Sequence, residues 1–345
     1  MAKLPGTGEY FVEKLAALGR EARGAVLSAR LKNADFAGVS KHTSADTIYQ
    51  LDTHVEPIIE RFCESWGQEM PLVLIAEGIE DEKGREGKAV FPRGTREEDA
   101  DVRVICDPID GTRGLMYDKR AAWFLAGVAP NREKGGDATR LSDIAAAVQV
   151  EVPTSKQGVS DVLWAIRGEG ARGVREEVRG GTFRKVQDLT LRPSQAGNID
   201  HGFATISNFF PGTKELASRL MEAIAEACIG PADVGKAMIF EDQYISTGGQ
   251  FYELMVGHDR LNADLRPLFY RIRGLPAGLC VHPYDVATVL IAREAGVVIT
   301  DGLGGELDGP LDVETPLHWA GFANEALRRR IEPVMLGMLR AWSTT

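Results

Sequence analysis

The amino-acid sequence predicts a mixed α/β (or α+β) protein built from two halves, and three observations point to this. Residues 8–33 and 47–66 carry apolar side chains at the three- and four-residue spacing of amphipathic helices. Several short apolar runs follow them, as expected for strands. Beyond about residue 200, strand-like and helix-like runs alternate, which is typical of an α/β layer.

The first half is predicted to place a sheet behind its two helices. Strands are expected where short apolar runs occur, at residues 72–76, 102–106, 121–129, 144–152 and 162–167. Charged, glycine-containing segments separate them: a loop or hairpin at 81–101 and turns at 130–142 and 168–182. This half, residues 1–195, is expected to carry most of the acidic side chains discussed below.

The second half, residues 196–345, is predicted to complete the same site. A strand is expected at 203–209 and another at 297–300. Helices are expected at 211–228, 244–256, 284–295 and 324–342, the third of them ended by Gly296.

Composition excludes some classes of function. The chain has 345 residues and a formal net charge of −10, so it lacks the general positive charge that binds nucleic acid polymers or anionic membranes. The four cysteines are widely spaced, which argues against a disulfide framework or a zinc ribbon. We see no signal peptide and no apolar run long enough to span a bilayer, so a cytoplasmic location is expected.

Acidic residues follow the ends of predicted strands. Glu77 comes directly after one strand, and Asp107 comes after the next in the string Asp107-Pro-Ile-Asp-Gly-Thr112. Pro108 is expected to stop the strand, so that Asp107, Asp110 and the Ile109 carbonyl point into one space. Such hard oxygen ligands suit magnesium better than zinc.

Gly111 and the backbone that follows it form a second feature of this segment, a possible contact with an anion. Gly111 permits an unusual backbone angle or a close approach, and the amides of Gly111 and Thr112 could face an anion. Taken singly, each acid has a plainer interpretation: Asp107-Pro108 as a turn, Glu77 as an exposed loop acid, and Asp285 as a helix N-cap.

The string from Asp107 to Thr112 resembles the signature of the inositol monophosphatase family, part of a wider group of lithium-sensitive, metal-dependent phosphatases that includes fructose bisphosphatases. Tyr284-Asp285, followed by a predicted helix ending in Glu-Ala-Gly296, resembles the second signature. The resemblance covers most of the chain and implies a layered α/β/α/β/α fold with the site between the two halves.

The resemblance also implies roles. Glu77, Asp107 and the Ile109 carbonyl would bind one magnesium ion, and Asp107, Asp110 and Asp285 a second, with two or three ions in all. Thr112, paired with Asp52 and helped by Glu77, would activate a metal-bound water for attack on phosphorus. The phosphate and substrate would be held by the remaining predicted contacts: Gly111, Thr112, Lys41 and Asp285. Family members are often homodimers.

Four departures from the family pattern are visible. Gly78 stands where a second glutamate is usual, so a third metal site is in doubt. Tyr284 replaces a tryptophan. The segment 264–282 is long and contains Arg266, Arg271 and Arg273, which would either recognise a second anion or form a solvated loop. Arg113 and Lys119 after the first signature could touch a substrate.

The sequence thus predicts a phosphatase acting on a small phosphorylated metabolite such as inositol monophosphate or a related sugar or polyol phosphate. Fructose-1,6-bisphosphatase and 3′-phosphoadenosine 5′-phosphate phosphatase activities stay open, as does a metal-binding regulatory protein that has lost turnover. A haloacid-dehalogenase-type mechanism is disfavoured because its acids lie two residues apart, whereas Asp107 and Asp110 lie three apart. A glycosidase is less favoured because the five tryptophans are scattered.

Overall fold

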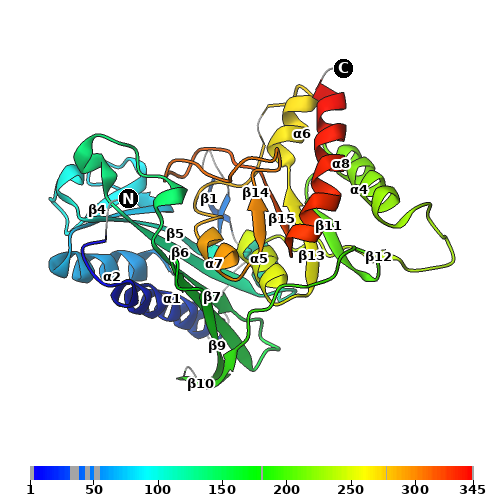
Figure 1. The fold of residues 1–345 in the computed structure, drawn as a ribbon. Coiled ribbons are helices and arrows are strands. Elements are labelled where there is room, and N and C mark those ends of the chain that lie inside the picture. Colours follow the sequence, from blue (N-terminus) through cyan, green and yellow to red (C-terminus); the bar gives the residue numbers. More distant parts are fainter. Residues whose placement is uncertain are drawn as a thin grey trace.

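The computed structural model describes residues 4–31, 39–42, 47–49, 55–179, 182–276 and 278–343. Two β-sheets and the helices that cover them form five alternating layers (Figure 1). This is the layered α/β/α/β/α arrangement that the sequence predicts.

The larger sheet has eight strands in the order β10-β9-β8-β7-β6-β5-β3-β4. Neighbouring strands are antiparallel except β3 and β5, which run parallel. The strands are β3 (Leu72–Glu80), β4 (Glu86–Phe91), β5 (Val102–Asp110), β6 (Ala122–Pro130), β7 (Ala146–Val152), β8 (Val159–Ile166), β9 (Ala171–Arg179) and β10 (Thr182–Leu189).

Helices α1 (Gly8–Leu31) and α2 (Glu56–Glu69) cover one face of this sheet. Val104 and Cys106 of β5 face these helices, whereas Ile105 belongs to the core on the opposite face. This alternation follows from the two-residue period of a strand, and burial on both faces explains why β5 reads as a continuous apolar run.

The smaller sheet has five strands in the order β12-β11-β13-β15-β14. Helices α5 (Thr247–Met255) and α7 (Val289–Glu294) lie between the two sheets, while α4 (Lys214–Ile229) and α8 (Glu325–Ser343) cover the outer face. The strands are β11 (Gly202–Ile206), β12 (Ile239–Phe240), β13 (Asp259–Asp264), β14 (Val298–Thr300) and β15 (Trp319–Phe322). The short helices α3 (Thr112–Met116) and α6 (Arg266–Ile272) follow β5 and β13, and β1 (Val39–His42) pairs with β2 (Thr47–Tyr49).

Two expectations about the elements were wrong. The charged segment 168–182 is not a turn, because β9 occupies most of it and pairs with β10. Cross-strand ion pairs, such as Arg175–Asp161 at 2.7 Å, stabilise these charge-rich strands. The predicted helix 47–66 begins only at Glu56, with Pro57 in its first turn, and residues 47–49 form a strand instead.

Four elements of the second half lie outside the predicted ranges: β12, β13, β15 and α6. Helix α7 is also shorter than expected, because residues 284–288 form turns before it. Among the helices of the described ranges, none combines the length and apolar character that crossing a membrane requires.

Candidate active site

The two parallel strands β3 and β5 end in irregular pairings that bring three acids together. The register between β3 and β4 shifts between Ile75 and Glu80, and that between β5 and β6 shifts between Asp107 and Asp110. The strand does not stop at Pro108 as expected, because β5 continues to Asp110 through the irregular stretch that contains the proline. A bulge tolerates proline and changes the direction of the side chains around it.

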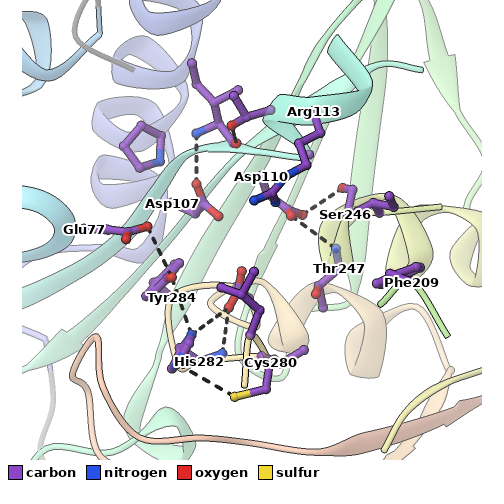
Figure 2. A pocket seen from close by; sticks show the side chains of 18 of the residues that line it. Glu77, Asp107, Asp110, Arg113, Phe209, Ser246, Thr247, Cys280, His282 and Tyr284 are labelled. Atoms are coloured by element: carbon purple, nitrogen blue, oxygen red, sulfur yellow. Dashed lines mark hydrogen bonds and ion pairs between the residues drawn. The ribbon is translucent and has the colours of Figure 1, made fainter. Parts of the chain in front are cut away.

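One pocket receives the acids of both signatures. Asp107, Asp110 and Asp285 each place a carboxylate oxygen within 4.8 Å of the others, although Asp285 lies about 175 residues further along the chain. Glu77 and Ile109 line the same pocket. Figure 2 shows Glu77, Asp107 and Asp110 in a row across it.

The three aspartates form an electrostatic environment that suits a cation. Burial and then the nearby Asp110 and Asp285 carboxylates raise the pKa of Asp107 well above its usual range. Burial and the Asp285 charge raise the pKa of Asp110 to about 7. Crowded, buried carboxylates repel one another, and a divalent ion with oxygen ligands relieves that repulsion. The donor set therefore fits magnesium.

Asp110 is held by the first turn of α5, in the helical layer between the two sheets. Its carboxylate accepts hydrogen bonds from the Ser246 hydroxyl at 2.8 Å and from the amides of Thr247 and Gly248 at 3.3 and 2.6 Å. The Ser246 oxygen also accepts a hydrogen bond from the amide of Gly249 at 2.9 Å, which caps the helix. A side chain at Gly248 would collide with Leu125, so glycine is needed for this close approach.

We expect Ser246→Ala to weaken metal activation, because Asp110 loses one of three donors and α5 loses its cap. The expected effects are a roughly tenfold higher magnesium requirement and a stability loss of about 1 kcal/mol. Magnesium titrations of phosphate release and thermal unfolding measure the two effects. The matched control is Thr247→Ala, which keeps the backbone donor, and an equal loss in that variant would contradict the role of Ser246.

Asp285 is positioned by its own turn and lies next to a stacked pair of rings. Its carboxylate accepts a hydrogen bond from the His282 amide at 2.6 Å. The rings of His282 and Tyr284 stack with centroids 5.6 Å apart. The Tyr284 hydroxyl donates to Glu77 at 3.3 Å, so this tyrosine makes a polar contact with an acid of the pocket (Figure 2).

The segment after Asp110 has the backbone that the sequence predicts. Gly111 has a φ of 95°, in the left-handed region, and a Cβ there would lie 3.0 Å from Ser246. Thr112 begins α3, and its hydroxyl donates to the Ile109 carbonyl at 2.7 Å. Asp52 lies outside the described residues, and Lys41 lies in β1, of which the structure describes only the backbone.

Gly78 has a backbone conformation that other residues rarely adopt. Its φ of 80° lies in the left-handed region, at the irregular end of β3. A glutamate at this position would therefore be strained. The departure from the family pattern therefore falls at a position whose backbone conformation favours glycine.

We expect Gly78→Glu to lower stability by about 1–2 kcal/mol, from left-handed strain, and not to raise activity. Thermal unfolding and phosphate release at saturating magnesium check this. The control Gly78→Ala carries the same strain without the carboxylate. A rate above that of the unmodified protein in Gly78→Glu alone would contradict the expectation.

Several pocket residues were missed by sequence reasoning. They are Glu56 at the start of α2, the ring pair Phe209 and Phe210, the α5 cap Ser246-Thr247, and Cys280. Of these residues, only the cap could have been predicted from the sequence. A serine before Thr-Gly-Gly is typical of a helix start, and the glycines allow a ligand to approach closely. The others come from loops whose path depends on the whole fold.

No protein-family model matches the chain, and no curated protein matches it. Solved structures do match over nearly the whole chain. The extragenic suppressor protein SuhB from Bartonella henselae is 18% identical, with a TM-score of 0.60 over 94% of this chain and 98% of that one. Fructose-1,6-bisphosphatase from Leishmania major is 11% identical, with a TM-score of 0.63 over 100% of both chains.

A third matching structure is described as an inositol monophosphatase–fructose 1,6-bisphosphatase, at 16% identity and a TM-score of 0.59 over 94% of this chain and 98% of that one. These likenesses define the class of fold. The chain has the layered fold of the inositol monophosphatase and fructose-1,6-bisphosphatase structures, as the resemblance of its two signatures predicts.

Proposed function

We propose that this protein is a magnesium-dependent phosphatase that hydrolyses a small phosphate monoester, such as inositol monophosphate or a related sugar or polyol phosphate. The observation that carries the proposal is the meeting of Asp107, Asp110 and Asp285 in one pocket. Two of these acids belong to one signature and the third to the other, on a fold that phosphatases share. Fructose-1,6-bisphosphatase and 3′-phosphoadenosine 5′-phosphate phosphatase activities are alternatives within the same reaction class.

The chain's residues would hold two or three magnesium ions. Asp107 would be shared between two sites, Glu77 and the Ile109 carbonyl would complete one, and Asp110 and Asp285 would complete the other. Bound magnesium neutralises charge on the phosphoryl oxygens and lowers the pKa of water. The α5 cap holds Asp110 in place, and its three donors favour the carboxylate form and so partly offset the rise in pKa that burial and Asp285 cause.

Other residues would position the phosphate and the attacking water. The Thr112 hydroxyl donates to the Ile109 carbonyl, so its lone pairs stay available to accept a hydrogen bond that orients the attacking water. We assign Asp52 as the partner of Thr112 and Lys41 as a charge near the phosphate, on the resemblance alone. The amides of Gly111 and Thr112, at the start of α3, would donate to a phosphoryl oxygen.

The proposal is tested by measuring phosphate release from a panel of inositol, sugar and nucleotide phosphates, with and without magnesium and with added lithium. Magnesium-dependent release from at least one compound is expected. Measurable magnesium binding without release from any compound would contradict the proposal and favour a metal-binding regulatory protein. We also propose that the protein is cytoplasmic, which cell fractionation tests, and that it is a homodimer, which light scattering tests.

A further inference from the structure

The pocket has a cationic and aromatic side as well as an acidic one. Arg113, Phe209, Phe210 and Arg266 line it together, and we call these four residues the arginine wall. Figure 2 shows Arg113 and Phe209 on the Ser246–Thr247 side of the pocket and Glu77 on the other side. Arg113 and Phe209 therefore lie on the Asp110 side of the pocket, away from Glu77.

Arg266 is a rigid member of this wall. Its side chain is only 8% exposed, and its Nε and Nη2 donate to the Asp264 carboxylate at 2.9 and 2.6 Å. Its Nη1 donates to the Leu279 carbonyl at 3.0 Å. A guanidinium has five N–H groups, so within the described ranges one N–H on each terminal nitrogen is left for a ligand.

The phenylalanine rings connect the two arginines. The Arg266 guanidinium carbon lies 5.1 Å from the Phe209 ring centre and 5.4 Å from that of Phe210. The Arg113 guanidinium carbon lies 5.9 Å from the Phe210 ring centre. Stacking on aromatic faces fixes planar guanidinium groups, which lowers the entropy lost when they bind an anion.

The wall can donate hydrogen bonds but cannot accept them. Its four side chains offer N–H groups and rings, with no oxygen atom. A polyol hydroxyl is best bound where donors and acceptors alternate, whereas a phosphate or carboxylate needs donors only. Five carboxylates and two guanidiniums line the pocket, and two divalent ions at the carboxylates would add four positive charges, which favours a substrate with more than one anionic group.

We propose that Arg113 and Arg266 bind a second anionic group of the substrate, so that the substrate class is a phosphate monoester carrying another phosphate or a carboxylate. This inference rests on the proposed function. It narrows that function: among the compounds proposed above, those that carry a second anionic group are preferred over the monophosphates of neutral polyols. The reacting phosphate lies at the aspartates, and the second anion lies at the arginine wall.

The test compares matched substrates: a hexose monophosphate, the corresponding bisphosphate, and a phosphorylated sugar acid. The readout is the ratio of kcat/KM for each two-anion substrate to that for the monophosphate. Arg266→Lys keeps a charge beside Asp264 but loses the planar fork, and Arg113→Gln removes the other charge. The matched control is Arg271→Gln, since Arg271 is an exposed residue of the same helix α6 that does not line the pocket.

The unmodified protein is expected to prefer a two-anion substrate, and the higher of the two ratios identifies the second group as phosphate or carboxylate. Each arginine variant should lower that ratio about 10- to 100-fold, mainly through KM, as loss of a charged hydrogen bond predicts. The control should keep the ratio. A preference for the monophosphate, or ratios unchanged in both arginine variants, would overturn the inference.

Failure of the proposed function gives a different result. If no compound releases phosphate, calorimetry with the hexose bisphosphate and magnesium measures binding directly. Weaker binding in Arg113→Gln and Arg266→Lys than in Arg271→Gln then supports the anion site without the reaction. Equal binding in all variants, or no binding to the unmodified protein, overturns it.

Discussion

Asp107→Asn is expected to lower the rate of phosphate release about a thousandfold, because the amide removes the ligand that the two proposed ion sites share. The fold should persist. The Asp107 carboxylate accepts a hydrogen bond from the Ile109 amide at 2.9 Å, and an asparagine oxygen can accept the same bond. Phosphate release at saturating magnesium measures the loss, and circular dichroism checks the fold.

The same variant should be more stable than the unmodified protein when no metal is present. Burial and neighbouring charges raise the pKa of Asp107 above the 3.8 of an unfolded chain, so its ionised form destabilises the folded state at pH 8. Asparagine removes that penalty, and the gain should shrink as the pH falls towards 3.8 and vanish about one pH unit below it, where the carboxyl is protonated in both states. Full activity, or lower metal-free stability at pH 8, would contradict the assignment.

Magnesium should bind more tightly as the pH rises from 6 to 8. In the metal-free protein, burial and Asp285 raise the pKa of Asp110 to about 7, so a proton competes with the ion below that pH. Each displaced proton lowers the apparent affinity up to about tenfold per pH unit below the pKa, and the dependence levels off above it. Calorimetric titration at several pH values, in buffers of different ionisation enthalpy, measures the affinity and the protons released.

Magnesium should also raise the thermal stability of the protein, and by more at pH 8 than at pH 6. An ion that binds only the folded state stabilises it according to its concentration relative to Kd. The control is Asp107→Asn, in which the shift with magnesium should be largely lost. If magnesium raised the melting temperature equally at both pH values, protons on the aspartates would not compete with the ion, which would contradict the prediction.

The first signature could be interpreted from the sequence because its chemistry is local. Asp107, Asp110 and Gly111 lie within five residues, so an apolar strand followed by turn residues brings two carboxylates together. The strands of the first sheet were predicted for a similar reason, since most of them are short apolar runs. The prediction that the strand stops at Pro108 was wrong, because the strand accommodates the proline at an irregular pairing.

The arginine wall could not be placed by the same reasoning. Phe209 and Phe210 lie on a loop after β11, and Arg266 follows β13, so their meeting depends on how the second sheet packs. The buried partner of Arg266, Asp264, is two residues away and looks like an ordinary surface charge in the sequence. The charged strands β9 and β10 were missed because cross-strand ion pairs, which a linear pattern does not reveal, stabilise them.

The hydrogen bond from the Gly248 amide to Asp110 has a practical consequence. This amide belongs to the middle helical layer, yet its acceptor is an acid of the eight-stranded sheet, 2.6 Å away. Its proton can exchange with solvent only when the contact between the helix and the acid opens. The exchange rate of this one backbone proton therefore reports whether the acids are assembled, in a protein that has been given neither metal nor substrate.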